Sequence, residues 1–267
     1  MFRTRLISGI VLLAVIISTG LLGGPVFALL LTAVALIGLY EFNRMIGMEK
    51  TVFSVAGSVM ALALFASCYF GYSGLGNAIT VLSLIVFMTI YVVTYPKYES
   101  GQVFAVATGW MYVVVLISCL LRIRLLDGGL TAFWLVFLGS WGSDTCAYCI
   151  GCLFGKHKAF PRLSPKKSIE GCIGGIAGAA LVCGIYALCL NLFFSDVSVS
   201  VIGYAVLGMA ASVVSQIGDL AASALKRNYG IKDYGKLIPG HGGILDRFDS
   251  ILFTAPIIYY SVVLFFQ

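Results

Sequence analysis

Long apolar runs fill this chain almost from end to end, and short polar loops separate them. Only 10% of the 267 residues are charged and 60% are hydrophobic, whereas a soluble domain carries about 25% charge. Such a chain has too little polar surface to face water on all sides, so lipid must be its solvent. The eight cysteines mostly lie inside the apolar runs, where they behave as small hydrophobic residues rather than as a disulfide framework. The composition therefore predicts an all-α membrane protein.

The length of the apolar runs gives the number of membrane crossings. A hydrocarbon core of about 30 Å requires roughly 20 apolar residues per helix, and by this measure the chain has about nine candidate transmembrane helices. They run over residues 5–22, 25–41, 52–70, 76–95, 103–121, 130–153, 171–194, 201–225 and 250–266. Glycines repeat at the start of the span 171–194 and predict close helix packing there. We expect an all-α polytopic membrane protein with a polar cavity open to the cytoplasm.

Basic residues indicate the orientation, because short loops rich in Lys and Arg lie on the cytoplasmic side of a membrane. With the N-terminus inside, all of the 17 Lys and Arg residues except Arg122 and Arg124 fall on the cytoplasmic side. This places the two longest polar loops, about 154–170 and 226–249, on the cytoplasmic face. The net charge of +6 is thus explained by membrane topology, and nucleic acid is not an expected partner.

Candidate chemistry is confined to the second half of the chain. Residues 1–125 contain apolar spans and short loops without clustered titratable groups, and we expect them to form an N-terminal transmembrane scaffold. Within them, Glu41 and Arg44 lie three apart at a helix end, and we interpret them as a pair at the membrane interface. Residues 126–267 are expected to form the catalytic region with its two cytoplasmic loops.

Two carboxylates lie inside apolar spans, where a charge is expensive. Asp144 occurs in WGSDTCAY and Asp219 in SQIGDLAAS. A carboxylate at such a position costs about 2.5–3.5 kcal/mol on insertion scales, so it is a functional candidate by default. The alternatives left open are a hydrogen bond between helices and a position at the wet cytoplasmic end.

Helical spacing aligns further polar residues with these carboxylates. Four of them share one face of the span 201–225: Ser215, Asp219, Ser223 and Lys226. Asp246 and Asp249 lie three apart, and both point the same way if the last helix begins just before them. Asp144 and Tyr148 share a face of the span 130–153. Three spans therefore offer acids toward the cytoplasmic side.

This set of residue types is typical of phosphoryl transfer. A hard cation held by one or two carboxylates bridges the phosphate oxygens of a triphosphate and neutralises charge in the transition state. Lysine and arginine side chains bind the oxygens that remain. Oxygen ligands favour Mg²⁺ over zinc at such a site.

The two cytoplasmic loops carry sequence motifs. The first contains SPKKSIEG over Ser164–Gly171, with two adjacent lysines after a proline. The second, Ser223–Asp249, contains S-x-L-K-R, K-D, P-G-H-G-G and L-D-R-x-D. Glycines on either side of His241 let backbone N–H groups approach an anion closely. Two alternatives stay open: His241 binds a phosphate or only holds the loop, and Glu170 caps the following helix or reaches a cation.

These motifs closely resemble those of the phosphatidate cytidylyltransferase family, also called CDP-diacylglycerol synthases. The resemblance covers roughly residues 143–250 at the level of motifs. It implies a nucleotidyltransferase of phospholipid biosynthesis in a bacterial cell membrane, which converts CTP and phosphatidate to CDP-diacylglycerol and pyrophosphate. The resemblance also implies that the lipid phosphate attacks the α-phosphorus of CTP in line, with Mg²⁺ as cofactor. A second cation and a homodimeric state are left open.

The resemblance also suggests roles for individual residues. We expect four to take part in catalysis: Asp219, Asp246, Lys226 and Lys167. Four aspartates are candidate Mg²⁺ ligands, the first two being the first choices: Asp219, Asp246, Asp144 and Asp249. Nine residues are candidates for binding the substrates: Ser164, Lys166, Ser223, Arg227, Lys232, His241, Gly242, Gly243 and Arg247. The expected partners are CTP, phosphatidate and membrane lipids.

Two other functions were weighed against this interpretation. A CDP-alcohol phosphotransferase is disfavoured, because its D-G-x-x-A-R…D-x-x-x-D pattern does not occur in this sequence. An ion-coupled transporter predicts charges near the bilayer midplane and internal repeats. Here the acids cluster toward one face beside basic loops, and no repeat is visible.

Overall fold

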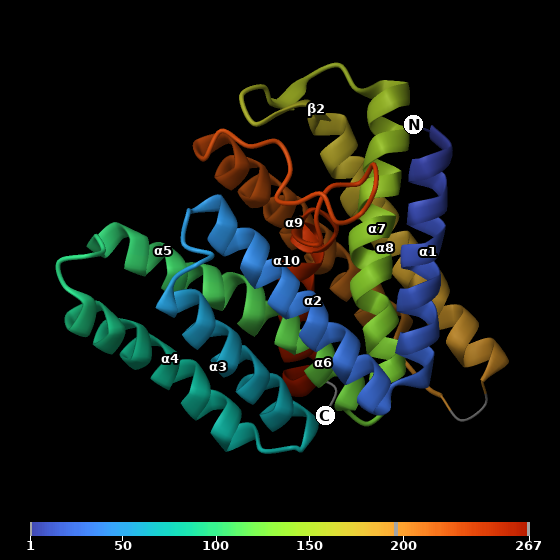
Figure 1. The fold of residues 1–267 in the computed structure, drawn as a ribbon. Coiled ribbons are helices and arrows are strands. Elements are labelled where there is room, and N and C mark those ends of the chain that lie inside the picture. Colours follow the sequence, from blue (N-terminus) through green and yellow to red (C-terminus); the bar gives the residue numbers. More distant parts are fainter. Residues whose placement is uncertain (1, 195–196, 266–267) are drawn as a thin grey trace. The chain divides into compact units, whose positions relative to one another are not determined.

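The computed structural model describes residues 2–194 and 197–265, and the side chains from residue 7 onward. Arg3 and Arg5 of the predicted basic set, and Phe266 at the end of the last predicted span, therefore lie outside the description of side chains. The helices are α1 (Phe2–Leu22), α2 (Gly24–Met45), α3 (Val52–Tyr69), α4 (Ser73–Thr94), α5 (Ser100–Trp110), the π-helical turn η1 (Met111–Val115), α6 (Leu116–Leu125), α7 (Gly129–Phe154), α8 (Ile169–Phe193), α9 (Val201–Asn228) and α10 (Leu245–Phe265). Two short strands, β1 (Lys158–Phe160) and β2 (Ser164–Ser168), complete the chain (Figure 1).

Every predicted span falls on a helical segment, which confirms an all-α polytopic membrane protein. Among the described residues, seven segments are long and apolar enough to cross a membrane: α2, α3, α4, the continuous stretch Ser100–Leu125, α8, α9 and α10. Helix α1 is apolar over Ile7–Leu22 but shorter in its described part. In α7 the polar stretch 139–145 lowers the hydropathy. Membrane crossing by α1 and α7 remains a prediction.

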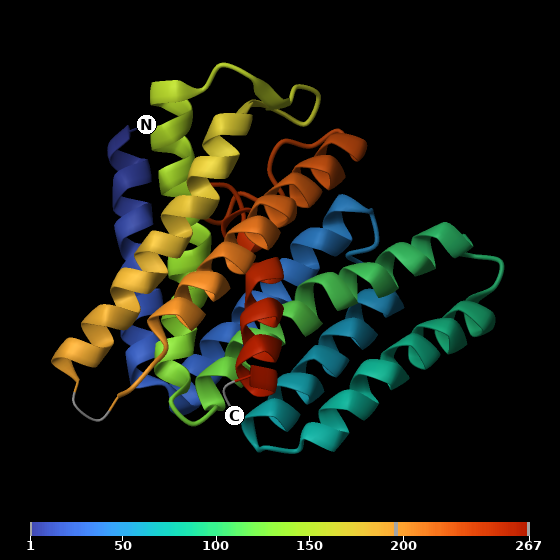
Figure 2. The ribbon, with the colours of Figure 1, turned by 180° about the vertical axis from the view of Figure 1, so that it is seen from behind.

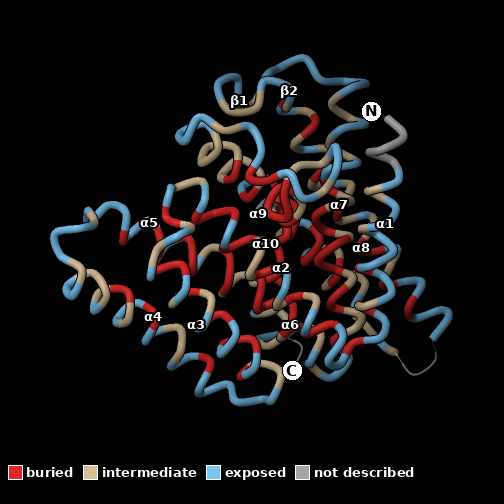
Figure 3. Tube along the Cα trace, viewed as in Figure 1, coloured by how far each residue is buried: buried red, intermediate tan, exposed pale blue. Residues whose placement is uncertain are grey.

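The outer surfaces of the helices are apolar, as lipid contact requires. Large hydrophobic side chains stand fully outward, for example Val93 on α4, Leu192 on α8 and Ile202 on α9, each almost four-fifths exposed. Figure 3 shows the exposed positions along the outer faces of these helices. In water such surfaces would be strongly unfavourable, whereas lipid tails solvate them.

The chain forms two compact units, which are described separately. The first comprises Met1–Asp127 with Asn228–Phe248, and the second comprises Gly128–Arg227 with Asp249–Gln267. In the first unit Trp110 is fully buried and its indole N–H donates to the carbonyl oxygen of Gly57 at 2.9 Å. A Cβ atom on Gly57 would lie 3.3 Å from that indole, so glycine lets α3 approach Trp110 closely.

Because the first unit includes Asn228–Phe248, the loop before α10 belongs to the unit built mainly by the first half of the chain.

In the second unit α7 and α8 run side by side over most of their length (Figures 1 and 2). Glycines of α8 make this approach possible. A Cβ atom on Gly174 would lie 2.6 Å from the side chain of Ile150, and one on Gly178 would collide with Cys146. The predicted close packing at the start of this helix is confirmed.

The first predicted loop, about 154–170, contains a structure that hydropathy does not indicate. Strands β1 and β2 form a short antiparallel hairpin, in which Lys158 pairs with Ser168 and Phe160 with Ser164. Strands this short lack a periodic pattern that a sequence reading could detect. The hairpin fixes the side-chain directions of the SPKKS motif.

Candidate active site

Three of the predicted site residues come together in the second unit. Lys167 projects from β2, Asp219 from α9 and Asp144 from α7. The Nζ atom of Lys167 is buried and lies 2.5 Å from Oδ2 of Asp219. The contact is an ion pair but not a well-directed hydrogen bond. The carboxylate of Asp144 lies within electrostatic range of both partners. We call these three residues the lysine–aspartate cluster.

Hydroxyl groups join α7 to α9 next to this cluster. Ser143 and Ser212 are hydrogen bonded at 2.6 Å, and Ser140 and Ser215 at 3.2 Å, and all four are buried. Each pair satisfies polar groups that would otherwise face hydrocarbon. Ser215 of the predicted polar stripe therefore serves helix packing. One turn further along the same face, the stripe places Asp219 against the hairpin.

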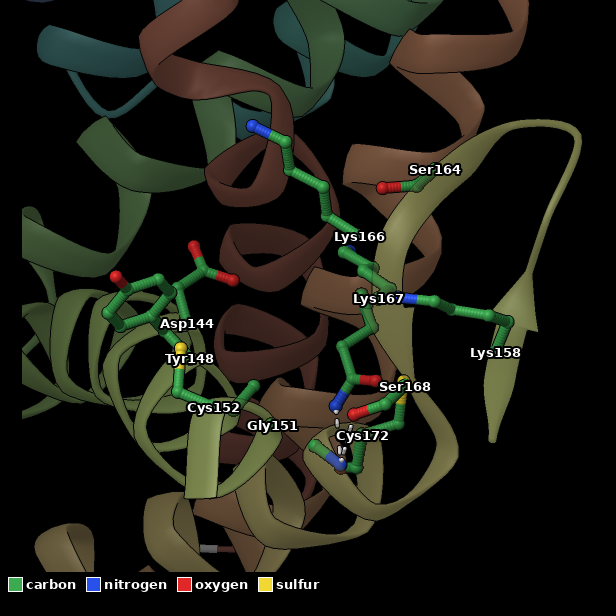
Figure 4. Close-up of a pocket in the computed structure, with 13 residues that line it drawn as sticks. Asp144, Tyr148, Gly151, Cys152, Lys158, Ser164, Lys166, Lys167, Ser168 and Cys172 are labelled. Carbon is green, nitrogen blue, oxygen red and sulfur yellow. Dashed lines mark hydrogen bonds between the residues drawn. The ribbon is translucent and has the colours of Figure 1, made fainter. Parts of the chain in front are cut away.

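A cavity of about 530 Å³ opens beside the cluster. Its walls include four predicted site residues, Asp144, Ser164, Lys166 and Lys167, together with Lys158, Tyr148 and Gln216. Figure 4 shows the lysines arriving from the hairpin and Asp144 with Tyr148 arriving from α7. A cavity with three ammonium groups and a carboxylate in its wall suits a polyanion that is bound together with a cation.

The hairpin is held at its base by side chains that bind backbone groups. The hydroxyl of Ser168 accepts a hydrogen bond from the N–H of Gly171 and caps α8. Glu170 accepts hydrogen bonds from the N–H groups of Lys156 and His157, and it contacts the His157 ring at 2.6 Å. Glu170 was expected either to cap the following helix or to reach a cation, and these contacts with the backbone and the ring of His157 are neither. Its carboxylate closes the loop.

Most of the second predicted loop, Asn228–Phe248, lies in the first unit and is organised around Asp246. Helix α10 begins at Leu245, as expected, and Asp246 is buried in its first turn. One oxygen, Oδ2, accepts hydrogen bonds from the N–H of Tyr234 at 2.8 Å and of Gly243 at 2.9 Å. Gly242 has a φ of +87°, a conformation that L side chains rarely adopt. Asp246 therefore holds both sides of the glycine-rich loop.

Glu41 is a site residue that the sequence interpretation missed. It was expected to pair with Arg44 at the membrane interface. The interface position is wrong, because Glu41 is 5% exposed and its carboxylate turns toward α10, with Arg44 only within electrostatic range. Oε1 accepts a hydrogen bond from the N–H of Ile244 at 3.1 Å, and Oε2 accepts one from the N–H of Leu245 at 2.9 Å. A negative charge is stabilised at this position, where the helix leaves N–H groups unpaired.

Glycines make the approach of Glu41 possible. A Cβ atom on either Gly235 or Gly243 would collide with the Glu41 carboxylate. Both glycines belong to the loop, so the carboxylate touches it on two sides and also caps α10. One signal in the sequence could have revealed this residue: like Asp144 and Asp219, Glu41 is a carboxylate within an apolar run.

The loop encloses a second cavity of about 570 Å³, which we call the loop cavity. Three basic side chains line it, Lys232, Lys236 and Arg247, together with His241. The Nε atom of Arg247 is buried, and no hydrogen-bond partner for it occurs among the described residues. His241 contacts the hydroxyl of Ser8 through Nδ1 at 2.7 Å, so it ties the loop to α1. Phosphate binding by His241 remains a prediction.

The remaining predicted residues occupy the ends of helices. Ser223, Lys226 and Arg227 lie in the last two turns of α9, and Arg227 is exposed. Asp249 lies one turn into α10, and its Oδ1 accepts a hydrogen bond from the N–H of Ser250 at 2.8 Å. Their contacts with substrate remain predictions.

The carboxylates fit a cation that shares its ligands with a substrate. Within residues 2–194 and 197–265, no group of three or more histidine, cysteine, aspartate or glutamate side chains is arranged to hold a metal ion. Magnesium does not need such a group, because it is usually bound through one or two carboxylates plus substrate phosphates and water. Asp144 and Asp219, neighbours in the lysine–aspartate cluster, provide donors of this kind. The cluster and the basic loop are typical of a membrane enzyme that handles phosphates.

Comparison with known proteins specifies the class further. A model of the cytidylyltransferase family matches residues 3–265. The chain is 31% identical over 271 residues to a phosphatidate cytidylyltransferase of Bacillus subtilis, covering 98% of both chains. It is 33% identical over 268 residues to a protein of the same name from Staphylococcus haemolyticus, covering 96% of this chain and 97% of the relative. The chain therefore belongs to the cytidylyltransferase family, and it is a nucleotidyltransferase.

Proposed function

We propose that this enzyme transfers the cytidylyl group of CTP to phosphatidate and so forms CDP-diacylglycerol and pyrophosphate. The observation that carries the proposal is the match of the family model over residues 3–265, with full-length relatives named phosphatidate cytidylyltransferase. The lysine–aspartate cluster supports it, because a buried ammonium group beside carboxylates at a cavity suits a triphosphate with its cation. The membrane fold suits a lipid substrate.

In this reaction an oxygen of the lipid phosphate attacks the α-phosphorus of CTP in line. The bond from the α-phosphorus to the bridging oxygen breaks, and pyrophosphate leaves with that oxygen. A phosphate monoester is already ionised near neutral pH, since its second pKa is about 6. No general base is needed, and the protein contributes positioning and charge neutralisation.

The side chains divide these tasks by charge. Asp219 and Asp246 are the first candidates for holding Mg²⁺, and Asp144 and Asp249 are the second. When bound, the ion would neutralise charge on the phosphate oxygens. Lysine and arginine side chains orient the remaining oxygens: Lys166, Lys167, Lys226, Arg227, Lys232 and Arg247. Ser164, Ser223, His241, Gly242 and Gly243 are proposed to bind the substrates by hydrogen bonds.

A transfer assay on the purified protein tests the proposal. CTP labelled at the α-phosphorus is incubated with phosphatidate in mixed micelles, with Mg²⁺ or with EDTA. We expect the label to enter the lipid fraction with release of one pyrophosphate per lipid, and only when Mg²⁺ is present. Lipid that stays unlabelled at saturating CTP would refute the proposed function. Labelling in EDTA would refute the metal requirement.

Lys167→Arg tests whether the cluster lysine binds phosphate. Lys167 Nζ is buried against Asp219, and a compact ammonium cannot be replaced there by a planar guanidinium without changing the contact. We expect kcat/KM for CTP or phosphatidate to fall at least about tenfold, which corresponds to the loss of one charge-assisted hydrogen bond. Lys50→Arg is the control, because Lys50 is exposed between α2 and α3. Wild-type kinetics for both variants would show that Lys167 only anchors the loop.

We also propose that both loops face the cytoplasm, on the basis of the distribution of Lys and Arg. Single cysteines at Phe160 and Lys236, in a background without native cysteines, should not react with an impermeant maleimide added to intact cells. Both positions are exposed and should react after the cells are opened. Efficient labelling from outside would reverse the orientation and remove access to cytosolic CTP.

A further inference from the structure

An apolar cavity of about 560 Å³ lies between α1, α2 and the loop before α10 in the first unit. Apart from Ser8, the residues that line it are apolar, among them Val15 on α1, Val34 on α2, Leu237 in the loop and Phe248 on α10. Its volume falls in the range of about 300–1,000 Å³ that small-ligand sites occupy. We call it the α1–α2 groove.

The groove adjoins the basic loop cavity. Ile238 lines both of them. The first turn of α10 also serves both, because Ile244 lines the groove while Arg247 lines the loop cavity. Ser8 lines the groove and contacts His241 of the loop cavity at 2.7 Å. A cationic chamber thus adjoins an apolar chamber, and the contact between Ser8 and His241 lies where the two meet.

An apolar groove next to a cationic cavity suits an amphiphile with an anionic head group. The buried Nε of Arg247, without a partner among the residues described, needs an acceptor. Two lysines nearby add positive charge, which suits a phosphate monoester. The apolar chamber excludes a free nucleotide or inorganic phosphate as its occupant, because neither brings apolar surface to bury.

We propose that the α1–α2 groove binds one acyl chain of phosphatidate while the loop cavity binds its phosphate. This rests on the proposed function and deepens it, since it assigns the lipid substrate to the loop before α10. It predicts that residues deep in the groove affect recognition of long acyl chains and not the chemistry. Val15 is suited to a test, because it lies seven residues beyond Ser8, about 10 Å along the helix.

The experiment compares two substitutions on two substrates. Val15→Trp fills the groove, whereas Ile17→Trp is the matched control, because Ile17 is not among the groove residues and both side chains are 37% exposed. The substrates are dioleoyl phosphatidate and dihexanoyl phosphatidate, whose short chains end nearer the loop. We expect Val15→Trp to raise KM for the dioleoyl substrate at least tenfold and to leave the dihexanoyl substrate within about twofold. Ile17→Trp should change neither value.

Each other outcome has a definite meaning. Unchanged KM for the dioleoyl substrate in Val15→Trp would overturn the proposal and leave the groove to ordinary bilayer lipid. An equal loss with both substrates would also overturn it, because the effect would not depend on the acyl chain. A wild-type enzyme that labels neither phosphatidate would instead refute the proposed function on which the inference rests.

Discussion

Asp246→Asn should lower kcat at least about 100-fold, the usual scale for a lost electrostatic contact in the transition state. The substitution removes the charge of Asp246 with little change in the shape of its side chain. Both backbone N–H groups that bind Asp246 donate to the same oxygen, Oδ2. The carbonyl oxygen of an asparagine can accept both of these bonds, so the two backbone hydrogen bonds are kept while the negative charge is lost. Asp219→Asn should cause a comparable loss, with removal of the ion pair to Lys167.

The measurement is the steady-state rate of CTP-dependent lipid labelling at saturating Mg²⁺. Asp127→Asn is the control, because this exposed aspartate lies between α6 and α7, outside both cavities. Thermal melting in detergent reports whether the variants are folded. A kcat for Asp246→Asn within a few fold of the wild-type value would remove Asp246 from the proposed set of metal ligands.

Glu41→Gln should be the second large effect, although Gln matches Glu in size. Glu41 uses both oxygens, each for a different N–H group at the start of α10. The amide of glutamine presents one acceptor and one donor, so its NH₂ would face an N–H group. An unsatisfied buried donor costs about 1–3 kcal/mol. Because the loop and the first turn of α10 rest on this contact, we expect kcat to fall at least tenfold.

A conservative variant separates positioning from general damage. Glu41→Asp keeps the charge and both acceptors and shortens the side chain by one methylene. If the role of Glu41 is to position the loop, Glu41→Asp should retain more activity than Glu41→Gln. Glu49→Gln, at a partly exposed residue between α2 and α3, serves as the control. The reverse order of activities, with Gln better than Asp, would show that bulk and not charge is what the site requires.

The fold could be predicted because its signals are local. In lipid each span must satisfy its own backbone hydrogen bonds, so hydropathy alone indicates where the spanning helices lie, to within a few residues at their ends. The polar stripe on α9 was predictable for the same reason, since helical periodicity fixes the face on which Asp219 lies. Its partner Lys167 was expected to bind phosphate, but the hairpin that aims it at Asp219 was not expected.

Glu41 could not be placed from the sequence because its partners carry no side-chain signature. They are backbone N–H groups more than 200 positions away. The nearby Arg44 offered a local explanation, and spacing rules favour local partners. The role of Ser215 could not be predicted from the sequence either. Ser215 and Ser223 share one face of α9, and only the contact with Ser140 shows that Ser215 packs against α7.

The contact between Glu41 and α10 also has a consequence for biosynthesis. A membrane protein is made from its N-terminus, so Glu41 enters the bilayer long before residues 244 and 245 leave the ribosome. Until then its carboxylate has neither of the two backbone donors that it has in the finished protein. The first compact unit, which includes Asn228–Phe248, is therefore completed only when the last helix begins to be made. Nascent chains that end before this point should carry an uncompensated carboxylate in α2 and be the preferred substrates of membrane quality control.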